Sequence, residues 1–178
     1  LMTNIDDEEN WEKESTIEDM KDNSIFDIGE QSFDRITQAI GLRSTFTIVF
    51  NILKELLGTN NISNWKYRFA GIQMISNYVD ITTRIPERGQ LEQHRSDISS
   101  TLIAYAADPH PRVRAASFYG LTSFIGCHGD GMNEEEMDKI LQVLLTSLSI
   151  GNNPSPRVRR EVLLALVSSL SMAHKSSV

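Results

Sequence analysis

The sequence predicts an all-α fold, an α-solenoid of repeated antiparallel helix pairs, and three observations support this prediction. The motif Pro-Arg-Val-Arg occupies residues 111–114 and recurs 45 residues later at residues 156–159. A tryptophan-led counterpart at residues 65–68 ends in Arg68, which precedes Arg114 by 46 residues. The apolar positions that follow the motifs keep step, as Ile72, Phe118 and Leu163, then Ile75, Leu121 and Leu166, then Val79, Ile125 and Leu170. Units of about 45 residues with two helical patterns each are typical of HEAT and armadillo arrays.

Length and composition indicate an ordered chain in a reducing compartment. The chain has 178 residues, of which 40% are hydrophobic, so it can bury a continuous core. Neither end shows the polar cap that a solenoid needs, and we therefore expect a segment of a longer array. The sequence contains no apolar run of about 18 residues, which predicts no membrane insertion. Its single cysteine, Cys127, excludes a disulfide framework.

The formal charge of −7 is concentrated at the N-terminal end of the chain. Residues 1–30 contain eleven carboxylates and two lysines. Residues 1–28 lack a helical apolar stripe, and we interpret them as an acidic loop or linker. Such a segment repels phosphate, which argues against direct nucleic-acid binding. It either is a solvated spacer or contacts a basic protein, with Trp11 as an aromatic anchor.

The first predicted helix is the second helix of a partial HEAT repeat at residues 29–41. Gly41 ends it, as glycine commonly does at a helix C-terminus. Its apolar positions at helical spacing are Phe33, Ile36 and Ile40. The acidic segment is then an insertion between two helices of one repeat, where solenoids tolerate insertions.

A complete repeat is predicted at residues 42–88. Its first helix covers residues 44–57, and Ser44 can cap that helix. Its second helix covers residues 65–79 and contains Gly71, which costs about 1 kcal/mol relative to alanine in a helix. We therefore expect a neighbouring helix to approach closely at Gly71.

Two further repeats are predicted at residues 89–131 and 132–178. Their helices cover residues 91–107, 112–127, 133–148 and 157–172. Pro109 and Pro111 separate the first two of these helices, because proline cannot continue the backbone hydrogen bonds. Asn133 begins a capping box, with a glutamate three residues later.

No set of residues indicates catalysis or metal binding. The four histidines are far apart, and Cys127 with His128 does not supply the converging ligands that zinc needs. The glycine-rich residues 126–131 do not follow a strand, so a phosphate-binding loop is not predicted. No serine lies in a nucleophile elbow. We expect a protein that is not an enzyme and that holds no metal and no cofactor.

One arginine recurs at the same position of the three repeats, as Arg68, Arg114 and Arg159. A guanidinium repeated at this interval can reach a carboxylate or a helix C-terminus of the neighbouring repeat. We interpret these arginines as structural links between repeats rather than ligand contacts, with Asp108 as the obvious partner. The equivalents of Asp108 in the other repeats are uncharged, so a complete ladder of ion pairs is not predicted.

Four stretches of the sequence carry a resemblance to a known family. They are Asp-Asp-Glu-Glu-Asn-Trp at residues 6–11, Gly-Glu-Gln-Ser-Phe-Asp-Arg at 29–35, Asn-Trp-Lys-Tyr-Arg-Phe-Ala-Gly at 64–71 and Asp-Pro-His-Pro-Arg-Val-Arg-Ala-Ala at 108–116. In this order and spacing they resemble the importin-β (karyopherin-β) nuclear transport receptors, nearest the importin-β3 branch. The chain is similar to the middle HEAT repeats of such a receptor.

The resemblance implies a superhelical carrier that binds cargo on its concave face and releases it when Ran in its GTP form binds. It implies contacts with nuclear pore proteins and shuttling between cytoplasm and nucleus. The acidic loop would face Ran or cargo with basic localisation signals, through Asp6, Asp7, Glu8, Glu9 and Trp11. By helical position the residues off the packing face of the second helices, and thus the candidate cargo contacts, are Gln73, Asn77, Asp80, Tyr119 and Arg160.

The alternative function is a HEAT-repeat scaffold subunit that holds other proteins together in a complex without a transport role. The acidic insertion with Trp11 favours the transport receptor. A partner whose binding ignored Ran would favour the scaffold.

Overall fold

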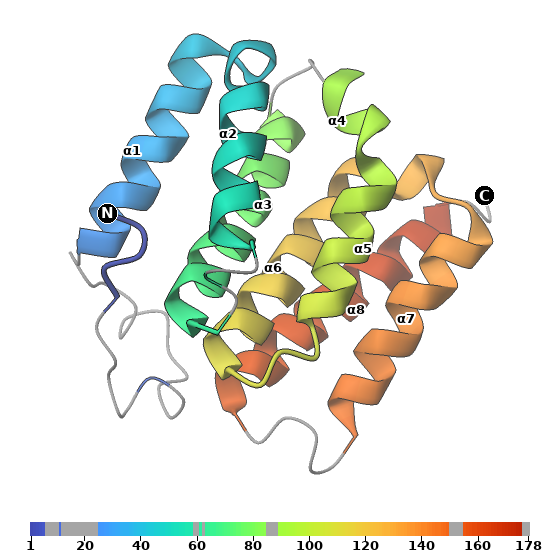
Figure 1. Cartoon of the computed structure of the whole chain (residues 1–178). Helices are drawn as coiled ribbons and strands as arrows, with labels where there is room; N and C mark the ends of the chain where they lie inside the picture. The colour runs from blue at the N-terminus through green and yellow to red at the C-terminus, as the bar shows by residue number, and fades with distance from the viewer. Residues whose placement is uncertain are drawn as a thin grey trace.

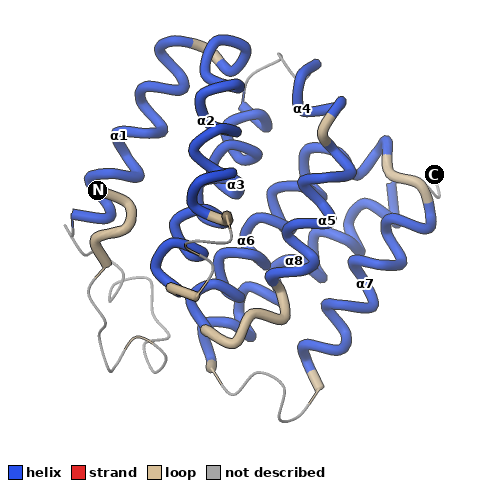
Figure 2. The backbone as a smooth tube through the Cα atoms, viewed as in Figure 1, coloured by secondary structure: helices blue, strands red, loops and turns tan. Residues whose placement is uncertain are grey.

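The structure is a computed structural model that describes residues 1–5, 11, 25–58, 61, 63–84, 89–149 and 155–175. Every regular element in these residues is helical, which confirms the all-α prediction (Figures 1 and 2). The elements are α1 Ile25–Ile40, α2 Leu42–Leu56, α3 Trp65–Arg84, α4 Gly89–Gln93, α5 Arg95–Tyr105, α6 Pro111–His128, the 3-10 helix η2 Gly129–Gly131, α7 Glu134–Leu148 and α8 Pro156–Lys175.

The helices are arranged as successive pairs whose second members lie side by side. Helix α2 packs on α3, α5 on α6 and α7 on α8, and the most extensive contacts join α3 to α6 and α6 to α8. Helix α1 packs against both α2 and α3. Figure 1 shows α2, α5 and α7 as one layer in front of a second layer formed by α3, α6 and α8. The core lies where these layers meet.

Helix α6 is the central element of the core because it is covered by α3, α5 and α8. Its large apolar side chains Phe118, Leu121, Phe124 and Ile125 are fully buried. Burying one such side chain contributes about 1.5–3 kcal/mol. The helix begins at Pro111, where a missing backbone N–H costs nothing, and its N-cap residue His110 accepts a hydrogen bond from the first turn.

Small residues allow α3 and α6 to pack closely against each other. A Cβ atom at Gly120 would lie 2.3 Å from Ser76 Oγ. That hydroxyl donates a hydrogen bond of 3.0 Å to the carbonyl oxygen of Ala116. The close approach expected at Gly71 is also confirmed, because a Cβ there would lie 2.7 Å from Leu57 Cδ2.

The largest differences from the predicted helix boundaries are found in α1, in α3 and in the helix predicted over residues 91–107. Helix α1 begins at Ile25, before the predicted start at residue 29, and α3 continues to Arg84 because Ile81 and Thr82 remain buried. The helix predicted over residues 91–107 is divided at His94 into α4 and α5. At this break the His94 ring packs against the aromatic rings of α2.

One predicted cap is present and one is wrong. Asn133 and Glu136 form the expected capping box at the start of α7. Helix α2 begins at Leu42, so Ser44 lies inside the helix and does not cap it. The N-cap position is Gly41, whose φ of 91° is a conformation that favours glycine.

Apolar positions that correspond between repeats differ in burial. Phe118 is fully buried, whereas its counterpart Leu163 is 52% exposed and Leu170 is 66% exposed. Among the described helices, α6 is packed by α3, α5 and α8, whereas α8 packs mainly on α6 and α7, so more of the α8 surface is left uncovered. In α1, Ile36 and Ile40 are exposed as well, so only part of the predicted apolar stripe contacts the core.

Replacing Gly120 by alanine tests the close approach of α3 and α6. We expect Gly120→Ala to lower the free energy of unfolding by about 1–3 kcal/mol, because the added methyl group overlaps Ser76 Oγ. Gly126→Ala is the matched control in the same helix, where an added Cβ meets nothing within 4 Å. This control should be neutral or stabilising by up to about 1 kcal/mol. Urea unfolding curves measure both effects, and equal midpoints for the two variants would contradict the packing described.

Candidate functional site

A polar patch spans α1, α3 and α6 and consists of Glu30, Gln73, Asn77, Asp80 and Tyr119. Glu30 Oε1 accepts hydrogen bonds from Gln73 Nε2 at 2.7 Å and from Asn77 Nδ2 at 2.8 Å. The Gln73 amide also donates to Asn77 Oδ1 at 3.1 Å. These bonds hold the Glu30 carboxylate of α1 over the middle of α3.

The α6 side of the polar patch is Tyr119, half-buried beside the carboxylates of α1 and α3. Burial is the main cause that raises the pKa of Tyr119 to about 12, and the negative charges of Asp80 and then Glu30 add to the rise. Asp80 itself forms an ion pair with Arg84, one turn further along α3. The patch therefore combines two carboxylates with amide and phenol groups from three helices.

The structure brings four of the five candidate cargo contacts together in the polar patch. Gln73, Asp80 and Tyr119 are half-buried, with part of each side chain at the surface. Asn77 is buried, so the expectation that it lies off the packing face is wrong; Glu30 of α1 covers it. Arg160 lies on α8, where its guanidinium contacts Glu161 at 3.2 Å. The sequence placed Glu30 in the predicted helix at residues 29–41 but gave no sign of its role, because its partners Gln73 and Asn77 lie more than 40 residues further along the chain.

Of the predicted acidic loop, Asp6, Asp7, Glu8 and Glu9 lie outside the described residues. Trp11 is described, and its half-buried indole ring contacts two guanidinium groups. The neighbouring segment is held by Lys66, whose Nζ donates to the carbonyl oxygen of Ile5 at 2.6 Å. The N-terminal segment thus contacts the beginning of α3.

The Trp11 cluster consists of Trp11, Trp65, His110, Arg112 and Arg157, at the N-terminal ends of α3, α6 and α8. The guanidinium carbons of Arg112 and Arg157 lie 5.2 and 5.0 Å from the Trp11 ring centroid. Arg112 also lies 5.7 Å from the Trp65 ring, which stacks on the His110 ring at 3.7 Å with an interplanar angle of 3°. Each cation–π contact contributes about 0.5–2 kcal/mol.

The sequence did contain a signal for the Trp11 cluster. Lys66, Arg112 and Arg157 each lie two residues before the recurring arginine of their repeat, so a cation recurs at this position too. Each of the three cations lies over a tryptophan ring. The tryptophan partners are distant in sequence, however, and only the packing of the helices brings them together.

The recurring arginines make different contacts. Arg68 binds Asp108 through two hydrogen bonds, Nε to Oδ2 at 2.7 Å and a terminal nitrogen to Oδ1 at 3.0 Å. The hydrogen bonds to Asp108, together with its negative charge, raise the pKa of Arg68. Both side chains of the pair are nearly inaccessible to solvent. Arg114 donates to the carbonyl oxygens of Asp108 and Pro109, in the turn before its own helix. Arg159 lies on an exposed position of α8.

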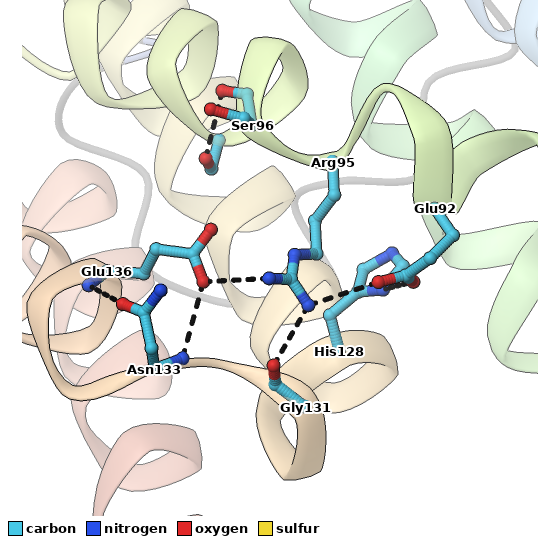
Figure 3. Close-up of polar contacts among 8 residues, drawn as sticks. Glu92, Arg95, Ser96, His128, Gly131, Asn133 and Glu136 are labelled. Carbon is cyan, nitrogen blue, oxygen red and sulfur yellow. Dashed lines mark hydrogen bonds and ion pairs between the residues drawn. The ribbon is translucent and has the colours of Figure 1, made fainter.

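A separate polar network links α4, α5, η2 and α7 (Figure 3). The acceptors around the Arg95 guanidinium are Glu92 at 3.1 Å, the carbonyl oxygen of Gly131 at 2.9 Å and Glu136 at 3.0 Å. His128 Nδ1 lies 3.1 Å from Glu92 Oε2. This network fastens the start of α7 to the preceding helix pair. In the described part of the chain, no group of three or more His, Cys, Asp or Glu residues is placed to hold a metal ion.

Comparison with known proteins assigns no family. No family model matches the chain, and no solved structure matches it. None of the helices in the described ranges is long and apolar enough to cross a membrane. The functional argument therefore depends on the surfaces described above.

Neutralising Asp108 tests the buried ion pair. We expect Asp108→Asn to lower the free energy of unfolding by about 3–5 kcal/mol, because it leaves the Arg68 guanidinium buried without its counter-charge. Asparagine keeps an oxygen that can accept the hydrogen bond from the His110 backbone N–H. Glu135→Gln, which removes an exposed pair with Lys139, is the control and should leave the urea midpoint nearly unchanged. A similar loss in both variants would contradict a special role for the buried pair.

The Tyr119 phenol should make stability depend on pH in the alkaline range. The pKa of Tyr119 is about 12 in the folded protein, above the ordinary tyrosine value of 10.0. The contribution of Tyr119 to stability is therefore complete below the ordinary pKa, and it is lost as pH rises toward the folded-state pKa. Wild type should therefore lose more stability than Tyr119→Phe when urea unfolding is compared at about pH 8 and about pH 11.5. A constant difference between the two proteins would contradict this assignment.

Proposed function

We propose that this chain is a protein-binding segment of a HEAT-type helical array in an importin-β-type nuclear transport receptor. The helix pairs, the side-by-side packing of α3, α6 and α8, and the recurrence of about 45 residues support the array. In such an array the second helices form a continuous surface, and ligands bind across several of them.

The observation that carries the proposal is the polar patch. It gathers the carboxylates of Glu30 and Asp80 with hydrogen-bonding groups of Gln73 and Tyr119, from three helices that are far apart in sequence. A lysine-rich localisation signal requires such carboxylates, since opposite charges steer the encounter and fix its register. Arg84 already pairs with Asp80, so a ligand cation would compete with it at this carboxylate.

The transport part of the proposal rests on the resemblance of residues 6–11, 29–35, 64–71 and 108–116 to importin-β receptors. It includes release of cargo by Ran in its GTP form, contact with nuclear pore proteins and shuttling between cytoplasm and nucleus. The acidic residues 6–9 are the proposed contact for Ran or basic cargo.

Binding of a labelled lysine-rich localisation peptide to the 178-residue chain tests the proposal by fluorescence anisotropy. We expect the double variant Glu30→Gln, Asp80→Asn to weaken binding at least about tenfold, because two charge-assisted contacts are lost. Glu134→Gln with Glu135→Gln removes the same charge from the exposed first turn of α7 and should change binding little. Binding should also weaken as salt increases.

The outcomes separate the candidate functions. Peptide displacement by excess Ran-GTP supports the receptor. Peptide binding that depends on the polar patch but ignores Ran-GTP favours the HEAT scaffold. Equal binding by the double variant and its control overturns the role of the polar patch.

A further inference from the structure

The Trp11 cluster has two parts, an indole ring and a surface that receives it. The receiving surface consists of Trp65, His110, Arg112 and Arg157, which belong to the start of α3, the turn before α6 and the first turns of α6 and α8. Trp11 belongs to a separate N-terminal segment, far from these helices in sequence. Its ring faces the guanidinium groups of both Arg112 and Arg157.

The part of the receiving surface formed by Trp65, His110 and Arg112 is held by contacts that do not involve Trp11. The His110 ring stacks on Trp65, and the His110 backbone N–H donates to Asp108 Oδ1 at 2.8 Å. His110 Nδ1 accepts a hydrogen bond of 3.3 Å from the backbone N–H of Arg112. Arg112 itself lies over Trp65. Because these contacts come from the helical body, we expect this part of the surface to keep its geometry when Trp11 is replaced.

The chemistry of the receiving surface selects one class of ligand. Guanidinium groups bind aromatic faces, tryptophan most strongly, and the helix N-termini at the same place favour negative charge. The segment that supplies Trp11 has this composition, because glutamates occupy positions 8, 9 and 12 around it. The tryptophan on this surface is therefore one whose neighbours in the sequence are rich in carboxylates.

We propose that the surface formed by Trp65, His110, Arg112 and Arg157 is a binding site for an acidic peptide segment with a central tryptophan in a partner protein. Trp11 is its internal ligand, and a partner binds by displacing it. The ligand is opposite in charge to the basic peptides of the polar patch, so this inference does not rest on the proposed function. An internal ligand competes at an effective concentration on the order of millimolar, which weakens binding of the partner until Trp11 moves away.

A labelled peptide with the sequence of residues 6–16 tests the site in the full chain by fluorescence anisotropy. We expect it to bind Trp11→Ala at least about tenfold more tightly than wild type, because the internal competitor is removed. The same peptide with alanine in place of its tryptophan should not bind. Adding Arg112→Gln and Arg157→Gln to Trp11→Ala should abolish binding, and adding Arg159→Gln instead, a cation of the same helix, is the control and should preserve it.

A second measurement uses the unaltered chain, so it does not depend on how well Trp11→Ala folds. The chain contains two tryptophans, and 5-fluorotryptophan labelling gives one fluorine resonance for each. Millimolar unlabelled peptide should move the Trp11 resonance toward that of a solvent-exposed indole. A Trp11 resonance that stays in place at saturating peptide overturns the proposal. Equal binding of the peptides with and without tryptophan to Trp11→Ala overturns it as well.

Discussion

The buried ion pair between Arg68 and Asp108 is the interaction on which the arrangement of α3 and α6 depends. It joins the first turn of α3 to the turn that precedes α6, with both side chains nearly inaccessible to solvent. Two buried charges are tolerated only when their geometry satisfies both partners. Asp108 also accepts the His110 backbone N–H, and Arg114 binds the Asp108 carbonyl oxygen. The pair therefore selects one register between the two helices.

That register determines both surfaces of interest. Near the ion pair, the rings of Trp65 and His110 stack, and Arg112 lies over Trp65. These residues form the basic and aromatic surface of the Trp11 cluster. Further along the same two helices, within the polar patch, the negative charge of Asp80 on α3 helps to raise the pKa of Tyr119 on α6. Between these two surfaces the helices are in close contact, because a Cβ atom at Gly120 of α6 would overlap Ser76 of α3. A change in the ion pair would thus disturb both the acidic polar patch and the basic Trp11 cluster, the two surfaces for which ligands are proposed.

Binding surfaces assembled from several helices suit extended ligands better than small molecules. Each helix of the polar patch contributes only one to three of its groups, so a ligand must span α1, α3 and α6 to use them. The Trp11 cluster likewise spans α3, α6 and α8. A peptide or protein segment has the length to contact either surface, and the two surfaces would discriminate ligands by charge.

The sequence by itself determined the helices apart from the break at His94, because apolar periodicity, prolines and glycines act over a few residues. It also determined the Asn133 capping box and the close approach at Gly71, and it indicated Asp108 as the arginine partner. Only the tertiary structure decided that Glu30 covers Asn77 and that Leu163 is exposed while Phe118 is buried. The physical reason is that burial and pairing depend on which residues meet from distant parts of the chain, and local periodicity does not specify those neighbours.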